Sequence, residues 1–205
     1  LLIAYGLRLG GYLLLREKRS AAYRKVLSPE MERSKKMPPG AKLGLWVTCG
    51  VLYILMTGPL YFRLHNGAAS DPMLWVGFAL MVCGVALELT ADIQKSTAKK
   101  KNSRRFVDTG LFRLVRCPNY LGEMIFWTGV FISGIGAVRG WQWLVCVLGY
   151  AGIIFVMFSG ARRLEIRQNK NYGKDPEYQK FVKTVPILLP FVPLYSVEKY
   201  KWLVA

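Results

Sequence analysis

Residues 41–62 read AKLGLWVTCGVLYILMTGPLYF and carry one charge, at Lys42. An α-helix rises about 1.5 Å per residue, so about 20 residues cross the hydrocarbon core of a bilayer, which is about 30 Å thick. The stretch therefore predicts a membrane-spanning helix. Further apolar segments repeat the pattern along the chain, at residues 1–15, 72–91, 120–138 and 141–160.

These five segments predict an all-α fold, a polytopic membrane helix bundle that forms one domain over residues 1–205. The first segment begins without a polar leader, so we expect it to be the remainder of a span whose earlier part, and further N-terminal spans, are missing. The tail at residues 184–195, TVPILLPFVPLY, is too short and too rich in proline to span. It is expected to lie along the membrane interface.

The composition separates a membrane protein from the other classes that a basic chain suggests. The formal net charge is +17, yet only 20% of the residues are charged and 53% are hydrophobic. A soluble nucleic-acid-binding protein would carry more charged side chains, and a disulfide-stabilised secreted protein would carry more than the 4 scattered cysteines found here. The cysteines lack metal-ligand spacing, so no metal site is predicted.

The basic residues gather in alternate connections between the predicted spans. Eight Lys and Arg lie in residues 16–36, six in 95–105 and seven in 162–183, whereas the connections around His65 and Arg139 hold almost none. The positive-inside rule places the three basic connections on the cytosolic or matrix side. The predicted inner-side loops are residues 16–40, 92–118 and 161–205.

The net charge therefore indicates topology and attraction to anionic headgroups, and not nucleic-acid binding. The same rule holds in the endoplasmic reticulum, the mitochondrial inner membrane and the bacterial plasma membrane. We expect the endoplasmic reticulum if the protein is eukaryotic.

Ionisable and amide side chains stand where the spans meet the inner side. Glu88 and Asp92 are four residues apart, as are Asn119 and Glu123, so each pair shares one helix face. Arg8 lies inside the first span. Such groups are costly in a membrane and usually face a polar cavity; side chains that reach out to water are the alternative. A cavity lined by them and by the nearby basic residues suits a dinucleotide, because Arg and Lys bind phosphates while carboxylates and Asn bind hydroxyls and amides.

The most informative segment is TGLFRLVRCPNYLGEMIFWTG at residues 109–129. A glycine and a proline interrupt the chain just before a span, which predicts a short amphipathic element, a turn and a helix with Pro118 or Asn119 in its first turn. The N-terminus of that helix carries partial positive charge and suits an anion. Gly122 and Gly129 are seven residues apart and permit another helix to approach closely.

This segment resembles the hallmark of the steroid 5-alpha-reductase superfamily: Gly-Leu-Phe or Gly-Leu-Trp, a basic residue, then Pro-Asn-Tyr or Pro-Asn-Phe, any residue, Gly-Glu and a tryptophan. The tail YGKDPEYQKFVKTVPILLP at residues 172–190 resembles the closing segment of that family. The opening IAYGLRLGGYLLLRE at residues 3–17 resembles the helix that carries its active-site tyrosine and a nearby arginine. The resemblance implies an all-helical membrane enzyme that uses NADPH to reduce a carbon–carbon double bond, usually conjugated to a ketone, in a steroid or other lipid.

By position, the resemblance also implies roles for single residues. Tyr5 would be catalytic, because its hydroxyl would donate to the substrate carbonyl and stabilise the enolate. The residues expected to bind NADPH are Arg8, Asp92, Lys99, Arg105, Asn119, Glu123 and Arg163. The expected partners are the lipid or steroid substrate and membrane lipids, without nucleic acid.

Two other functions stay open. Membrane methyltransferases that use S-adenosylmethionine on an isoprenylcysteine or phospholipid share an Arg-x-Pro-x-Tyr-x-Gly turn and a similar tail, although Tyr5 and Arg8 fit the reductases better. The other is a non-catalytic subunit of a larger membrane complex. Cys117 and Glu88 depart from the family pattern, and the glutamate that the family carries on an earlier helix has no counterpart here. Binding of NADPH or of S-adenosylmethionine separates these functions.

Overall fold

The computed structural model describes residues 1–19 and 21–204, and every regular element in that part of the chain is a helix. The predicted all-α class is therefore confirmed. The helices are α1 (Leu2–Arg19), α2 (Ala21–Lys36), α3 (Pro39–His65), α4 (Pro72–Lys101), the short 3-10 helix η1 (Gly110–Arg113), α5 (Pro118–Ile132), α6 (Gln142–Tyr172) and α7 (Pro176–Thr184). Ser20 and Ala205, which fall in the first and third predicted basic loops, lie outside the described residues.

Among the described residues, three helices are long and apolar enough to cross a membrane. They are α3, α4 and α6, with 27, 30 and 31 residues. The other two predicted spans correspond to shorter helices: the apolar part of α1 covers Leu2–Leu15, and α5 has 15 residues. Helix α5 ends at Ile132 and not at residue 138, because the chain turns at Gly136, whose φ of 84° suits glycine.

The predicted basic loops are in large part helical, which corrects that expectation. Helix α2 lies within residues 16–40, α4 continues to Lys101, and α6 continues to Tyr172 before α7 begins. Lys, Arg, Gln and Ala are good helix formers, so a helix does not end where the apolar sequence ends. The spans thus extend as polar helices beyond their apolar parts.

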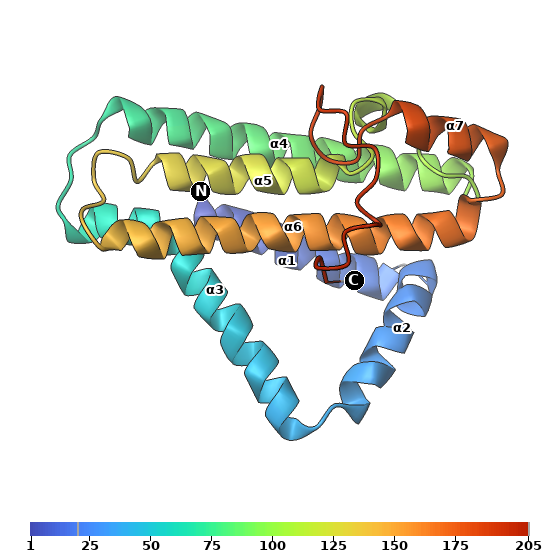
Figure 1. Ribbon diagram of the computed structural model, residues 1–205, viewed down its shortest axis with the longest axis horizontal. Helices are drawn as coiled ribbons and strands as arrows, with labels where there is room; N and C mark the ends of the chain where they lie inside the picture. The colour runs from blue at the N-terminus through green and yellow to red at the C-terminus, as the bar shows by residue number, and fades with distance from the viewer. Residues whose placement is uncertain (20, 205) are drawn as a thin grey trace. The chain divides into compact units, whose positions relative to one another are not determined.

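The chain divides into two compact units, Leu1–Ile54 and Leu55–Ala205. The first contains α1, α2 and the beginning of α3, and it exposes apolar side chains such as Ile3, Leu7 and Trp46. In the second, Figure 1 shows α4, α5 and α6 side by side. The division concerns packing, and the prediction of one domain stays a prediction.

Helices α4 and α5 pack through two pairs of glycines. A Cβ atom on Gly77 would lie 2.5 Å from the carbonyl oxygen of Gly129, and one on Gly84 would lie 2.6 Å from that of Gly122. Only glycine allows backbones to come this close. The pairs run in opposite order along the two helices, so the helices are antiparallel. The predicted close approach at Gly122 and Gly129 is confirmed.

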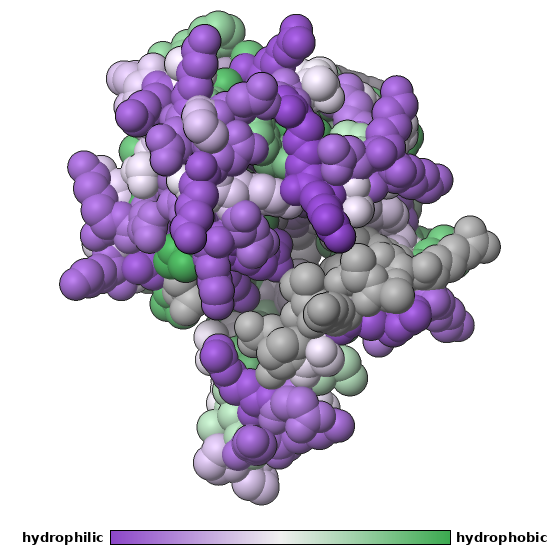
Figure 2. Space-filling model, turned by 90° about the vertical axis from the view of Figure 1, so that its right-hand side faces the viewer, coloured by the Kyte–Doolittle hydropathy of each residue, from purple (hydrophilic) through white to green (hydrophobic). Residues whose placement is uncertain are grey.

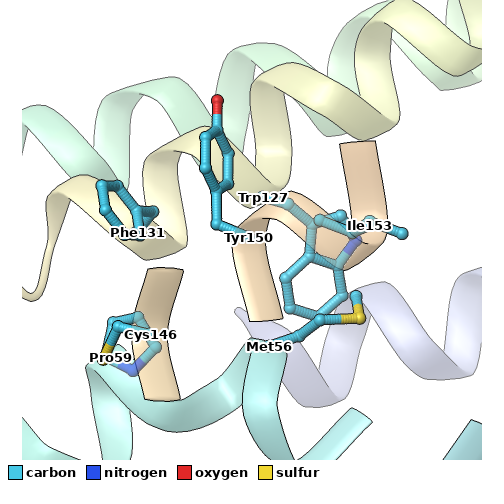
Figure 3. A pocket seen from close by; sticks show the side chains of 7 residues that line it. All are labelled: Met56, Pro59, Trp127, Phe131, Cys146, Tyr150 and Ile153. Carbon is cyan, nitrogen blue, oxygen red and sulfur yellow. The ribbon is translucent and has the colours of Figure 1, made fainter. Parts of the chain in front are cut away.

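Helices α3, α5 and α6 meet in an apolar contact that leaves no room for a water molecule. Figure 3 shows its side chains: two from α3, two from α5 and three from α6. The hydroxyl of Tyr150 lies 2.9 Å from that of Thr128 on α5, which satisfies the polar tip of an otherwise apolar ring. This part of the bundle is a packed core, so a ligand site has to be sought elsewhere. The lining residues are Met56, Pro59, Trp127, Phe131, Cys146, Tyr150 and Ile153.

Candidate functional site

Helix α5 begins as the sequence predicted. The 3-10 helix η1 and a turn precede it, and Pro118 is its first residue, where the missing N–H of proline costs nothing. Cys117 occupies the N-cap position, and its side chain makes no capping hydrogen bond. Instead, the backbone N–H groups of Arg116 and Cys117 donate to the carbonyls of Pro186 and Ile187, at 2.9 and 3.0 Å.

The acidic and amide side chains of α4 and α5 meet next to this helix start. The amide of Asn119 donates to the carboxylate of Asp92 at 2.5 Å. Glu88, one turn earlier on α4, is 3% exposed, and its Cγ would lie 2.8 Å from a Cβ on Gly122. Both acids of α4 therefore lie on one face, as their spacing predicted, and that face meets α5. Glu123, one turn along α5, accepts a hydrogen bond from the indole of Trp127 at 3.1 Å.

Lys99 and Arg105 lie together beyond the end of this helix pair. The ammonium of Lys99 donates to the carbonyl of Arg105 at 2.5 Å and to the hydroxyl of Tyr172 at 2.9 Å. The guanidinium of Arg105 forms ion pairs with Asp108 at 2.8 Å and Glu177 at 2.6 Å. The pKa of Arg105 is raised, most strongly by its hydrogen bond to Asp108 and next by its hydrogen bond to Glu177. Both cations are thus held at the joint of α4, α6 and α7.

A groove of about 480 Å³ runs between the last turns of α4 and the segment that follows it. Of the predicted residues in the described chain, Arg105 lines it, whereas Asp92, Asn119 and Glu123 do not. Figure 2 looks onto this end of the Leu55–Ala205 unit and shows hydrophilic side chains gathered over it. The full lining is Ile93, Gln94, Thr97, Ala98, Lys101, Asn102, Arg105, Phe106, Val107, Asp108, Thr109 and Gly110.

The remaining predicted residues lie apart from these groups. Tyr5 belongs to the Leu1–Ile54 unit, and the guanidinium of Arg8 lies 5.9 Å from the centre of its ring. Arg163 is exposed on α6. Its neighbour Arg162 donates instead to the carbonyls of Glu198 and Leu203. The structure therefore brings Tyr5 together with Arg8, Asp92 with Asn119, and Lys99 with Arg105, and it does not bring Arg163 to either pair of the second unit.

One buried ion pair was missed by the sequence reasoning. Arg116 and Glu165 are 2% and 3% exposed, and their nearest charged atoms lie 2.8 Å apart. Arg116 stands inside the segment that carries the resemblance, but nothing in its spacing distinguishes it from a basic residue on the membrane surface. The available signal was Glu165, an isolated acid on the inner end of a span.

Burial shifts two pKa values beside this pair. It raises the pKa of the Cys117 thiol to about 12 and that of the Tyr178 hydroxyl to about 12. Both groups therefore stay protonated at neutral pH. The thiol is a packing group here and not a nucleophile, and the Tyr178 hydroxyl donates to Asn169 at 2.8 Å.

Comparison with known proteins gives one family match and several curated relatives. A family profile described as a protein of unknown function, DUF1295, matches residues 1–185. The steroid 5-alpha-reductase DET2 of Arabidopsis thaliana is 29% identical over 168 residues, which cover 75% of this chain and 59% of that protein. The 3-oxo-5-alpha-steroid 4-dehydrogenase 1 of Bos taurus is 26% identical over 176 residues, which cover 83% of this chain and 63% of that protein.

The 3-oxo-5-alpha-steroid 4-dehydrogenase 1 of Homo sapiens is 25% identical over 154 residues, which cover 71% of this chain and 54% of that protein. The chain therefore spans less than two thirds of the length of each of these relatives. No solved structure matches the chain.

Proposed function

The chain belongs to the DUF1295 family and to the steroid 5-alpha-reductase superfamily, and on that premise we propose that it reduces a carbon–carbon double bond with NADPH. The substrate class is a steroid or another lipid in which the double bond is conjugated to a ketone. The observation that carries the proposal is the hydrogen bond between Asn119 and Asp92, next to the end of the bundle where Lys99 and Arg105 are held.

The residues at this end fit a nicotinamide dinucleotide phosphate. The groove of about 480 Å³ falls within the usual range of ligand pockets, about 300–1,000 Å³. Lys101 and Arg105 on its wall supply positive charge for phosphates, and Asn102 and Asp108 supply acceptors for ribose hydroxyls. Asp92, Asn119 and Glu123 supply further acceptors and an amide donor at the start of α5.

The proposed chemistry uses the side chains as follows. NADPH, when bound, supplies the hydride that reaches the carbon β to the ketone. Tyr5 donates a hydrogen bond to the carbonyl oxygen and stabilises the negative charge that develops on it. Arg8, next to the ring of Tyr5, keeps a positive charge near that oxygen. Asn119 and Asp92 orient the amide and sugar of the cofactor, since their donors and acceptors match those groups.

Cofactor binding is the first test. The full chain, purified in detergent, is expected to unfold at a higher temperature with saturating NADPH than without it. Asn119→Ala and Glu123→Ala are expected to remove most of that shift. Asn66→Ala is the matched control, because Asn66 bonds to Ala137 and Gln142 at the opposite end of the unit. A folded wild-type chain that gains no thermal stability from NADPH contradicts the proposal.

Turnover is the second test. With NADPH and a panel of enone steroids, the chain is expected to give products that carry two more hydrogen atoms, one from the hydride of NADPH at the β carbon and one taken up from water as a proton at the α carbon. Tyr5→Phe is expected to lower kcat by about 100-fold or more while leaving NADPH affinity unchanged, because it removes a donor to the developing oxyanion. Stabilisation by S-adenosylmethionine in place of NADPH indicates a methyltransferase. Stabilisation by neither ligand, with co-purification in a stoichiometric assembly, indicates a non-catalytic subunit.

A further inference from the structure

We propose that the buried ion pair of Arg116 and Glu165 is a positioning device for Asn119. It holds residues 185–204, here named the C-terminal segment, against the residues that precede α5. In this way it fixes where α5 begins and which way its first turn faces. The proposal deepens the proposed function, because Asn119 is there assigned to the cofactor.

Each charge of the pair binds the C-terminal segment as well as its partner. The guanidinium of Arg116 donates to Glu165 and to the carbonyl of Tyr195. The second carboxylate oxygen of Glu165 accepts from the backbone N–H of Val197 at 2.8 Å. Two buried charges are costly to desolvate, and here each also satisfies a backbone group outside regular structure, although Nε and Nη1 of Arg116 have no hydrogen-bond partner in the described part of the chain. The ion pair therefore holds the C-terminal segment in place.

Backbone hydrogen bonds connect the C-terminal segment to the residues directly before α5. Arg116 and Cys117 donate their N–H groups to Pro186 and Ile187 of the C-terminal segment. The next residue, Pro118, has no N–H, and the Cys117 side chain makes no capping bond. The first turn of α5 thus lacks a side-chain cap, and the C-terminal segment instead fixes the two residues directly before that turn.

Apolar packing supports the same contact. The side chains of Cys117, Ile187 and Val197 are buried in one core cluster, together with Met124 of α5 and Ala161 of α6. In Figure 1 the C-terminal segment passes over α5 and α6 towards the end of the chain. Loosening the ion pair therefore exposes a core that contains the residue directly before α5.

The consequence for Asn119 follows from helix geometry. Asn119 is the second residue of α5, and its amide binds Asp92 on α4. A helix turns by about 100° per residue, so a start displaced by one residue swings that amide away from Asp92. Arg116 and Glu165 touch no ligand in this scheme, and they act on the cofactor through Asn119.

The variant Glu165→Gln tests the proposal, because it keeps the shape of the side chain and removes its charge. The first measurement is the rate at which a maleimide alkylates Cys117 in the folded chain, with Cys49 and Cys83 replaced by serine because both are exposed. The rate is expected to rise about 10-fold or more as the C-terminal segment opens locally. The second measurement is the Kd for NADPH, expected to rise about 10-fold or more while kcat at saturating NADPH changes little.

Arg162→Gln is the matched control. Arg162 also binds the C-terminal segment, at Glu198 and Leu203, but it does not touch the residues before α5. It is expected to leave both measurements unchanged. If Glu165→Gln does not fold, Arg116→Lys replaces it, because the hydrogen bonds to Glu165 and Tyr195 both come from one terminal guanidinium nitrogen, which the shorter lysine side chain does not reach.

The alkylation rate and the Kd for NADPH together test the proposal. Slow alkylation of Cys117 in the folded variant overturns the proposal, as does an exposed Cys117 with an unchanged Kd for NADPH. Equal effects of Glu165→Gln and Arg162→Gln overturn it too, because they indicate general loosening. If the wild-type chain binds no NADPH, the proposed function fails, and the alkylation rate still decides whether the pair fixes the start of α5.

Discussion

Arg63 and Asp71 show how single side chains close the end of the Leu55–Ala205 unit that lies opposite the basic end. Arg63 is buried, and its guanidinium lies 2.5 Å from the carboxylate of Asp71 and 2.7 Å from the carbonyl of Ser133. Asp71 also caps α4 by accepting from the N–H of Leu74 at 2.9 Å. Two residues thus tie the connection before α4 to the connection after α5.

Replacing Asp71 with asparagine tests the charge of this pair. The hydrogen bond from Arg63 lowers the pKa of Asp71 from its ordinary value of 3.8. A carboxylate with a lowered pKa stabilises the fold above the unfolded-state pKa, and that contribution is lost as the pH falls through the folded-state pKa. We expect Asp71→Asn to lower the Tm at pH 7, and we expect this effect to shrink as the pH falls below 3.8 and through the lowered folded-state pKa.

Asparagine also caps helices well, so the loss at pH 7 reports the charge and not the cap. The measurement is thermal unfolding in detergent over this pH range. A difference in Tm between the two proteins that stays constant down to the lowest pH contradicts the assignment.

The pair of Arg116 and Glu165 makes a prediction about stability that is separate from its proposed effect on Asn119. Removing one partner leaves a buried charge alone, which costs about 3–5 kcal/mol. We expect Glu165→Met and Arg116→Met each to destabilise the chain by this amount. The double variant should lose less than the sum of the two, because no lone charge remains. Chemical unfolding in mixed micelles measures all three, and fully additive losses contradict the buried ion pair.

At the residue scale, the sequence predicted partners within one helix better than partners across the chain. The spacing of Glu88 and Asp92 placed both on one face of α4, since helix geometry alone decides that. The structure adds that this face packs against α5. Arg116 and Glu165 are 49 residues apart, and their contact depends on how the C-terminal segment folds back. The C-terminal segment has no regular secondary structure, so the periodicity of the sequence does not predict its path.

At the scale of the element, the antiparallel pair of α4 and α5 depends on its glycines. A Cβ on Gly84 would lie 2.6 Å from the backbone N of Phe126 as well as from the carbonyl of Gly122. Backbone atoms cannot move aside as a flexible side chain can. We therefore expect Gly84→Ala to destabilise the chain by about 1–3 kcal/mol or more, the range for overpacked sites.

Gly50→Ala is the matched control for that variant, since no atom lies within 4 Å of a Cβ at Gly50 in α3. It is expected to be neutral or slightly stabilising, because alanine favours helix over glycine. Thermal unfolding of both variants in the same detergent measures the difference. Equal stability of the two variants contradicts the close packing of α4 on α5.

Helix length was the weakest prediction at this scale. The apolar segments located α3, α4 and α6, because hydrophobic length is a strong signal. The basic ends of α4 and α6 were expected to be loops, since charge indicates where a helix leaves the membrane but not where it stops. Gly122 and Gly129 could be read correctly from spacing alone.

At the scale of the whole Leu55–Ala205 unit, the two ends of the bundle differ in charge. One end carries Lys99, Arg105 and the basic turns of α6 and α7, and the other carries the connections closed by Arg63. The positive-inside rule assigns the first end to the cytosolic or matrix side. We expect a cysteine at Lys174 and a cysteine at Ser70 to lie on opposite sides of the membrane.

Both positions are exposed, so each reporter should react when it is accessible. In sealed vesicles with a known orientation, a membrane-impermeant maleimide should label one of Ser70→Cys and Lys174→Cys before lysis and both after it. The background lacks Cys49 and Cys83, which are exposed on α3 and α4. Labelling of both reporters from the same side of intact vesicles would mean that α4, α5 and α6 do not all cross the bilayer, because these three helices separate the reporters and only an odd number of crossings places them on opposite sides. The site proposed at the basic end would then have to be reached from a membrane surface and not from within a spanning bundle.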